Sequence, residues 1–405
     1  MDARAEIGCR VAHARRRRGL SQAVLAELVG RSESWLSQVE RGLRAIDSHS
    51  VLIRLAEVLG VEIGQLTAQE VGAETVKYEP VAGIREAMAR YGALPGVINA
   101  RANRDRPPNL RWSDHEMRRV NNLYQAARYD EVGRLLPGLI DVVEQARFSC
   151  ARAERRTADT LRALIYHSVT MTLSRVGDAE LAWMAADRSI AAAEAAERPL
   201  LGAVSAYRLG YVLIRLKQAA NAEDLLMRTA DALAATTRRG RPPALSVRGG
   251  LYLAATTAAA ARFDRAGADR HLAMAREVAG QVGADRNDFW SAFGPTNVVI
   301  HEVSIAVAFG DAKLAMRRGE ALDADRLGAG LHGRRTQVLL DLARAYAQQR
   351  KDAAAVNTLL RAERVSPELV RYDQRTNELL TELVRREHRA STPDLRGLAR
   401  RAGVI

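Results

Sequence analysis

A short run of polar side chains near the N-terminus has the chemistry to bind nucleic acid. Ser32, Glu33, Ser34, Ser37 and Gln38 carry hydroxyl, carboxylate and amide groups, which hydrogen-bond to base edges and to phosphates. The apolar residues among them recur at helical spacing, so one helix would bury an apolar stripe and expose these five side chains on its other face. Such a helix needs partners that fix its position.

Predicted helices before this segment would hold it. A first helix ends at Gly19, and a second helix, capped by Ser21, covers residues 21–29. Gly30 makes the tight turn into a third helix over residues 32–41, which carries the polar run. Two short helices joined in this way have helix-turn-helix geometry, in which the second helix presents its N-terminal side chains to the major groove.

The chain that follows completes the N-terminal domain. Ser48 or Ser50 begins a fourth predicted helix, and residues 61–66 indicate a short fifth helix that closes the core. We therefore expect residues 1–70 to form a five-helix DNA-binding domain.

Residues 19–61, GLSQAVLAELVGRSESWLSQVERGLRAIDSHSVLIRLAEVLGV, resemble the lambda-repressor-like, or Xre, helix-turn-helix family. The matching features lie in one register: Leu20-Ser21-Gln22, Leu25-Ala26, Ser32, Leu36-Ser37, Glu40-Arg41-Gly42 and the closing Leu59-Gly60-Val61.

The resemblance implies a role for individual residues. Gln22, at the start of the second helix, would meet the DNA backbone or a base, and Arg15 would pair with Glu40 in a structural role. Base readout would rest on Glu33, Ser34 and Gln38, and phosphate contacts on Ser32, Ser37, Arg41 and Arg44. Glu33 stands where well-known members carry glutamine; a carboxylate accepts from cytosine N4 but repels phosphate, so the recognised sequence stays open.

Net charge supports a nucleic-acid partner only in part. The chain has a formal charge of +13, which favours an acidic partner. Residues 1–78, however, contain 11 Lys and Arg against 10 Asp and Glu, so motif rather than charge identifies the DNA-binding end. Two interpretations of Arg16, Arg17 and Arg18 stay open: they contact phosphate, or they form a solvated helix end that favours the helix dipole. Trp35 either packs on the domain or touches DNA.

Residues 71–110 differ in composition from both flanking regions. Glycine and proline recur there, and Pro107-Pro108 forbids a continuous helix. We interpret the segment as a linker that contains one short helix, over residues 81–91.

Helix after helix is predicted for residues 111–390. Similar breaks, among them Gly177-Asp178 and Phe263-Asp264, recur about 40–50 residues apart, and an Ala-rich amphipathic helix follows each. This period is typical of stacked helical hairpins, because one hairpin cannot bury both of its faces alone. Residues 339–369 resemble a tetratricopeptide repeat. We therefore expect an all-α chain with a tetratricopeptide-like α-solenoid, and a C-terminal tail over residues 391–405.

The tandem of an Xre-like domain and such repeats resembles two groups of regulators. One comprises the peptide-sensing quorum regulators of Gram-positive bacteria. The other comprises Arg- and Ala-rich regulators from high-GC Gram-positive bacteria, many of them linked to secondary metabolism; residues 181–194 and 292–312 look similar to this second group.

A solenoid of this kind forms a concave groove, lined by the first helix of each pair, that could grip a peptide or a small molecule. The effector-binding candidates are Asn122, Tyr211, Asn297 and His301, with Tyr166, His167, Tyr207 and Tyr252 as further polar or aromatic positions. For most of them, helix packing by a tyrosine or a satisfied buried histidine is the competing interpretation. Asn297 and His301 form the best pair, because their i, i+4 spacing places them on one helix face.

Several other function classes lack support in the sequence. GAGLHG at residues 328–333 is a literal G-x-G-x-x-G but has no preceding strand, and His301-Glu302 lacks the second histidine of a zinc protease. Cys9 and Cys150 form neither a disulfide framework nor a metal motif, which suits a reducing cytosol. We expect no enzyme activity, no cofactor or metal, no membrane span and a cytoplasmic location.

The sequence thus predicts a sequence-specific transcription regulator that binds double-stranded DNA. Its repeat domain would sense a peptide or small-molecule effector and mediate formation of a homodimer, because paired half-sites supply the affinity that one small domain lacks. The alternative is a DNA-tethered scaffold for protein interactions that senses no small effector. A deep polar groove favours the first hypothesis, and a flat, dry concave face favours the second.

Overall fold

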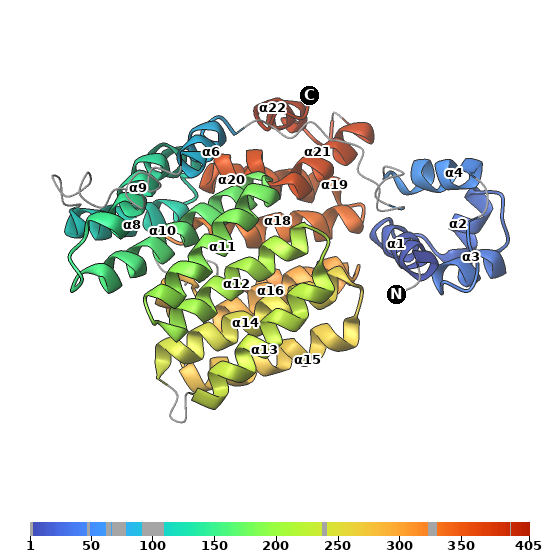
Figure 1. Cartoon of the computed structure of the whole chain (residues 1–405). Helices are drawn as coiled ribbons and strands as arrows, with labels where there is room; N and C mark the ends of the chain where they lie inside the picture. The colour runs from blue at the N-terminus through green and yellow to red at the C-terminus, as the bar shows by residue number, and fades with distance from the viewer. Residues whose placement is uncertain are drawn as a thin grey trace.

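The computed structural model describes residues 3–46, 49–61, 66, 78–90, 109–236, 241–322, 330–388 and 390–405. These residues form helices and no strand, which confirms the all-α prediction. Figure 1 shows a small N-terminal group of helices at one end of a larger helical array, with α1 the helix nearest to that array.

Four helices of the N-terminal domain are described: α1 (Ala3–Arg17), α2 (Gln22–Leu28), α3 (Glu33–Glu40) and α4 (His49–Leu59). Their boundaries follow from the predicted caps. The Ser21 hydroxyl accepts from the backbone N–H of Val24, and the Ser32 hydroxyl accepts from that of Trp35, so each satisfies a free donor at a helix start. Gly19 and Gly30 adopt φ of +66° and +68° in the turns that precede α2 and α3.

Residues 62–65 of the fifth predicted helix lie outside the described residues; Val61 follows α4 directly, and Leu66 is buried. Leu25 and Leu36 are fully buried in the same core. Leu28 is 46% exposed, because α2 is short and presents only Leu25 and its neighbour Ala26 to the core.

The repeat domain consists of antiparallel helix pairs. The first helices of the pairs are α8 (Leu110–Gln125), α10 (Arg155–Val176), α12 (Pro199–Arg215), α14 (Pro242–Ala261), α16 (Pro295–Ala308) and α18 (His332–Gln348). The second helices are α9 (Tyr129–Ser149), α11 (Ala179–Ala195), α13 (Ala219–Thr236), α15 (Arg265–Val282), α17 (Ala312–Ala321) and α19 (Asp352–Val365). Each helix packs on its partner and on the next pair, as expected of a solenoid.

The turns inside the pairs explain why similar breaks recur in the sequence. A left-handed residue ends the first helix, for example Gly177 at φ +95° or Phe263 at φ +60°. In two of the pairs an aspartate follows and caps the second helix: Asp178 accepts from the N–H of Leu181, and Asp264 accepts from that of Gly267. The predicted periodicity is therefore a periodicity of turn chemistry.

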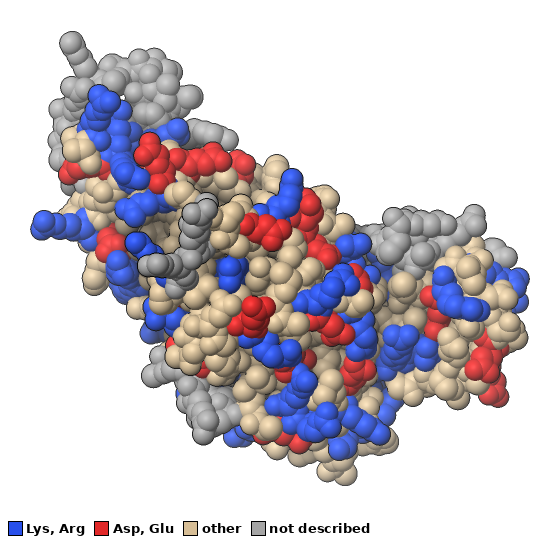
Figure 2. Space-filling model, turned by 90° about the horizontal axis from the view of Figure 1, so that it is seen from below, with Lys and Arg blue, Asp and Glu red and all other residues tan. Residues whose placement is uncertain are grey.

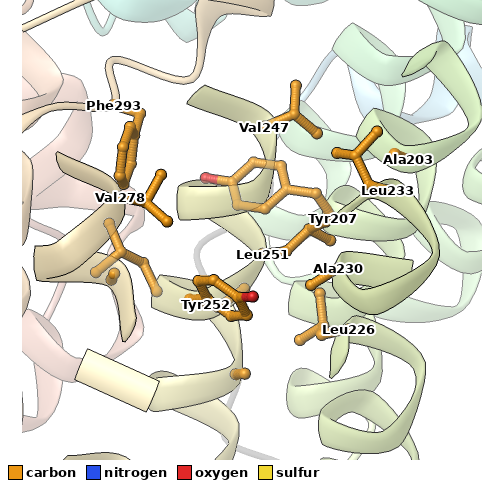
Figure 3. Packing of buried hydrophobic residues seen from close by; sticks show 14 of the residues in the cluster. Ala203, Tyr207, Leu226, Ala230, Leu233, Val247, Leu251, Tyr252, Val278 and Phe293 are labelled. Carbon is orange, nitrogen blue, oxygen red and sulfur yellow. The ribbon is translucent and has the colours of Figure 1, made fainter. Parts of the chain in front are cut away.

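Between pairs, large side chains and close backbone approach fill the core. Figure 3 shows Tyr207 of α12, Leu226 of α13 and Leu251 of α14 packed together. Gly249 of α14 faces the ring of Phe293, and a Cβ at Gly249 would lie 1.9 Å from its Cζ atom. Burial of each such leucine contributes about 1.5–3 kcal/mol relative to exposure.

The segments on either side of the pairs belong to the same structure. α6 (Val81–Ala89) is the helix predicted within the linker, and it packs on α9 through its buried Ile84 and Met88. At the other end, α20 (Pro367–Tyr372), α21 (Gln374–Arg385) and α22 (Leu395–Arg401) follow.

Residues 391–405, expected to form a C-terminal tail, contain the helix α22. Leu395 and Leu398 of α22 are fully buried. This apolar pair completes the core over α21, which a solvated tail could not do.

The array curves back until its two ends meet. α20 contacts α9, and α18 contacts α8. The hydroxyl of Tyr372 donates to the Asp130 carboxylate at 2.8 Å, and the backbone N–H of Asp130 donates to Glu368 at 2.9 Å. The hydroxyl of Tyr78, just before α6, donates to the carbonyl of Tyr129. The first helices of the pairs consequently surround a central space.

Candidate nucleic-acid interface and central cavity

A buried ion pair, joined by a glutamine, holds α1 and α2 against α3, the helix that would read DNA. Arg15 Nε donates to Glu40 Oε1 at 2.6 Å, and Arg15 Nη2 donates to Glu40 Oε2 at 2.8 Å. Gln22 Nε2 donates to the same carboxylate at 2.7 Å, and Arg15 Nη1 donates to the carbonyl of Leu20 at 2.8 Å. The expected Arg15–Glu40 pair is confirmed. Gln22, expected at the DNA backbone, is held here by Glu40.

The polar face of α3 lies as its spacing predicts. Glu33 and Ser34 are exposed, and Ser37 and Gln38 are partly exposed, while Leu36 on the opposite face is fully buried. These polar side chains stand in the first two turns of the helix, where a recognition helix meets base edges.

Trp35 packs on the domain rather than standing free. It is 7% exposed, and the guanidinium of Arg31 lies 5.7 Å from its ring centre. Of the expected phosphate-binding residues, Ser32 caps α3, and Arg41 Nε donates to the carbonyl of Ser37 at 3.2 Å. Arg44 is exposed.

The basic run at the end of α1 makes contacts that neither sequence interpretation foresaw. Arg18 Nε donates to the carbonyl of Leu59 at 2.7 Å, within the N-terminal domain. Arg17 lies beside Glu378 and Glu382 of α21, and both carboxylates raise its pKa against the larger, opposite effect of burial.

Two successive turns of the repeat domain also meet α1. The ring of His13 lies 4.9 Å from that of Phe263 in the α14–α15 turn, and burial lowers the pKa of His13 to about 3. Gly310 in the α16–α17 turn lies against Arg16, where a Cβ would come within 3.1 Å of the arginine Cβ. α1 thus connects the DNA-binding domain with the repeat domain.

Charge on the outer surface is mixed. In Figure 2, Lys and Arg side chains alternate with Asp and Glu over the visible face of the described residues. This face has no single basic patch, so the +13 formal charge does not mark the DNA-binding surface there.

The central space is a cavity of about 1540 Å³. Its wall includes side chains from all six first helices, from the α10–α11 turn, and from α6 and α21. The volume exceeds the roughly 300–1,000 Å³ common for small-molecule sites, so a ligand as large as a short peptide has room.

Two of the predicted effector-binding residues meet at this wall. Tyr211 of α12 and His301 of α16 both line the cavity, and the Tyr211 hydroxyl lies 3.4 Å from His301 Nε2. His301 Nδ1 lies 2.9 Å from the carbonyl of Asn297, so this nitrogen carries the proton and Nε2 accepts from Tyr211. Burial and the nearby Arg334 lower the pKa of His301 to about 4, which keeps its ring neutral at pH 7.

The two asparagines do not line the cavity among its described wall residues. Asn297 is buried. It contacts His301 through its backbone carbonyl and not through its side-chain amide. Asn122 is exposed, and its side-chain oxygen accepts from Trp290 Nε1 at 3.2 Å, so it positions a wall residue. Of the further candidates, Tyr207 lines the cavity, and Tyr166, His167 and Tyr252 do not.

Sequence reasoning missed the arginines of the wall. Arg208 and Arg215 lie on α12 beside Tyr207 and Tyr211, and Arg334 lies at the start of α18. The signal was present on α12, because arginines seven residues apart share a helix face with tyrosines four residues apart.

The described part of the chain holds no cluster of three or more histidine, cysteine or acidic side chains that could bind a metal ion. None of its described helices is long and apolar enough to cross a bilayer. Cys9 and Cys150 are both free thiols.

Comparisons with known proteins agree with the N-terminal domain. Residues 6–69 match the family model described as a helix-turn-helix domain. Among solved structures, the chain is similar to Bacillus thuringiensis PlcR in complex with the peptide PapR7 and DNA. That similarity has 12% identity and a TM-score of 0.32, over 87% of this chain and 99% of the other, and such low values support no inference about function. No curated protein matches the sequence.

Proposed function

From a helix-turn-helix DNA-binding domain joined to a closed array of helical repeats, we propose a transcription regulator whose operator affinity responds to an effector bound in the central cavity. The DNA-binding half of this proposal rests on residues 6–69 and on the exposed polar face of α3. Glu33, Ser34 and Gln38 contact base edges, while Ser32, Ser37, Arg41 and Arg44 contact phosphate. Gln22 reaches DNA only when it exchanges its bond to Glu40 for one to the backbone.

The observation that carries the effector half is the cavity itself. A scaffold for protein interactions needs only an accessible surface, whereas this array surrounds a partly open cavity of about 1540 Å³ whose wall includes arginine, tyrosine and histidine. Tyr211 and His301 offer neutral hydrogen-bonding groups at its wall. This deep cavity with charged and hydrogen-bonding side chains in its wall favours an effector over the alternative of a scaffold that senses nothing.

The effector signal passes to DNA through α21 and α1. Arg375 and Glu378 of α21 line the cavity. The same two side chains act on α1, since Glu378 raises the pKa of Arg17 and Arg375 lowers that of His13. A ligand that moves α21 changes how the DNA-binding domain docks, and docking in turn changes ligand affinity by the same factor.

The active form is a homodimer. One small domain with one recognition helix has little affinity, and two such domains about 34 Å apart reach successive half-sites on one face of DNA. Sedimentation of the full chain should give twice the mass of a 405-residue monomer. A strictly monomeric protein that still protects paired half-sites would overturn this part of the proposal.

The decisive experiment is a mobility-shift assay. Purified full-length protein is titrated into the DNA upstream of its own gene cluster at two salt concentrations, with and without culture extract. We expect a sequence-specific shift that the extract alters. A specific shift that is indifferent to extract would support the scaffold alternative.

A further inference from the structure

The cavity wall has an uneven distribution of charge between its elements. The six first helices contribute Arg175, Arg208, Arg215, Arg334 and Arg344 to the described wall and no carboxylate. From these arginines we infer that the cavity binds an anionic ligand, one with a carboxylate or phosphate group. This inference rests on the proposed effector function of the cavity and names the class of its effector.

Two of the five arginines already have a carboxylate partner. Arg344 Nη2 donates to Asp373 at 2.6 Å, and Arg175 lies 3.9 Å from the same carboxylate. These charges hold the pKa of Asp373 at about 2, so the group stays ionised. Asp373 thus pairs directly with these two arginines, and its charge also raises the pKa of Arg215 against the larger, opposite effect of burial.

The other three arginines have no carboxylate partner among the described residues. Arg208 is 5% exposed; its Nη2 donates to the carbonyl of Phe289 at 3.0 Å, and its Nε has no partner. Arg334 Nη2 donates to the carbonyl of Ser291 at 3.2 Å. For Arg215, no hydrogen bond or ion pair to a described residue is present, although its side chain is accessible from the cavity.

The pKa values of two of these arginines are lowered, as expected for cations without a paired carboxylate. Burial, together with the neighbouring Arg175, lowers the pKa of Arg215 to about 10. Burial also lowers the pKa of Arg208, and the charge of Arg334 adds to that effect. A guanidinium remains charged at pH 7 nonetheless, so the buried Arg208 lacks the counter-charge that normally offsets loss of water. Arg215 and Arg334 are more accessible and add their positive charge to the cavity wall.

The side chains around them include the neutral hydrogen-bonding groups of Tyr211 and His301. Burial raises the pKa of Tyr211 and lowers that of His301, so both are uncharged at pH 7. The remaining wall carboxylates lie outside the six first helices. Asp178 pairs with Arg85 at 2.5 Å, Glu378 faces Arg17, and the other three are Glu79, Glu86 and Glu180. An entering anion therefore meets cations and hydroxyl donors, which give short, charge-assisted hydrogen bonds.

Aromatic side chains in the wall indicate what else the ligand contains besides its anionic group. Tyr207 and Trp290 line the same region, and the guanidinium of Arg208 lies 4.9 Å from the Tyr207 ring centre. Aromatic faces beside cations suit a ligand that joins an apolar or planar body to its anionic group.

Fluorescent dye binding to the full-length protein tests the inference without DNA. The probe is anilinonaphthalene sulfonate, and its uncharged parent N-phenylnaphthylamine measures binding that does not depend on charge. We expect Arg215→Gln and Arg334→Gln each to weaken sulfonate binding at least tenfold and to leave binding of the parent unchanged. Arg215→Lys should retain most of the affinity because it keeps the charge.

Arg270→Gln is the matched control, because Arg270 is exposed on α15 and outside the cavity wall. Circular dichroism verifies that each variant keeps its helical content. Equal sulfonate affinity in the Arg215, Arg334 and Arg270 variants would overturn the inference. So would equal affinity of the wild-type protein for the sulfonate and for its parent.

Competition distinguishes the source of the anion. Displacement of the dye by inorganic phosphate assigns a phosphate ligand, and displacement by a short peptide acid but not by its C-terminal amide assigns a carboxylate. Displacement by the amide as strongly as by the acid would contradict recognition of charge. If dye binding depends on the arginines but operator binding does not respond to culture extract, the anion site is supported and the sensor function is refuted. If operator binding responds to extract but dye binding does not depend on the arginines, only the anion site is refuted.

Discussion

Single residues of this protein take their roles from their neighbours more than from their type. Gln22 and Gln38 are both glutamines of the helix-turn-helix pair that are expected to meet DNA, yet Gln22 is bonded to Glu40 and Gln38 is not. His167 and His301 are both buried and neutral, but only His301 faces the cavity. Predictions at this scale therefore concern one contact each.

Gln38→Ala should weaken specific DNA binding by about 1–3 kcal/mol and leave non-specific binding unchanged, because an amide can bond two positions of one base. A competition shift assay against non-specific DNA measures both affinities. Gln145→Ala, the same change at an exposed position of α9, is the control. Unchanged discrimination in the Gln38 variant would contradict the assignment of α3 as the reading helix.

Acid should destabilise the repeat domain through His167. Burial and the nearby Arg208 lower the pKa of His167 from 6.5 to about 3. Its Nε2 atom lies within hydrogen-bond distance, 2.8 Å, of the Ser205 hydroxyl oxygen. The neutral ring is favoured in the folded state, so its stabilisation is complete above pH 6.5 and is lost as pH falls from 6.5 towards 3. The loss at pH 5 is about 2 kcal/mol.

Melting temperatures at pH 5 and pH 7.5 measure this effect. His167→Gln should show a smaller drop between the two than the wild-type protein, with the remainder due to groups such as His13 and His301. His115→Gln, at a side chain 77% exposed, should keep the full wild-type drop. An identical drop in the His167 variant would refute the role of this ring.

At the scale of elements, turn chemistry and close packing define the repeats. A left-handed residue followed by a capping aspartate separates the helices of a pair, as at Gly177-Asp178 and Phe263-Asp264. Small residues then let neighbouring helices approach, as Gly249 does against Phe293. Helix propensity alone would favour alanine at every helical glycine, and packing decides where alanine is excluded.

Gly249→Ala should therefore destabilise the protein despite a propensity gain of about 1 kcal/mol, since overpacking a closed core costs about 1–3 kcal/mol. The new Cβ would lie 1.9 Å from the fully buried ring of Phe293. Gly280→Ala, in α15 with no atom within 4 Å of the new Cβ, should stabilise by about 0.5–1 kcal/mol. Thermal unfolding of both variants decides; a stabilised Gly249 variant would contradict the packing described here.

For the whole molecule, the contact of α1 with the repeat domain decides whether a cavity event reaches DNA. Phe263 stacks on His13 while its backbone is left-handed, a conformation that glycine adopts without strain. Phe263→Gly should thus loosen the docking of the two domains without weakening the repeats. Small-angle scattering should show a larger radius of gyration, and the response of operator binding to effector should shrink.

Glu197→Gly is the matched control for this change. Glu197 also has a left-handed backbone, at φ +50°, and its side chain pairs with Arg156 inside the repeat domain. The control should keep the wild-type radius and effector response. If the Phe263 variant kept the wild-type radius of gyration and the wild-type effector response, the contact of α1 with the repeat domain would not couple the cavity to DNA binding.

The sequence by itself determined the local features of this protein. Serine caps, turn glycines and apolar spacing specify α2, α3 and the recurring breaks, because each depends on residues within one or two helical turns. The Arg15–Glu40 pair was implied by resemblance and is present.

Tertiary structure alone decided what lies together across the array. The meeting of α9 with α20 joins residues more than 230 positions apart, and no local pattern encodes it. That closure turns arginines that look like solvated charges in the sequence into the wall of a cavity, and it places Arg17 beside α21 rather than in solvent. The physical reason is that burial and electrostatic environment depend on neighbours in space, which the order of residues along one helix does not fix.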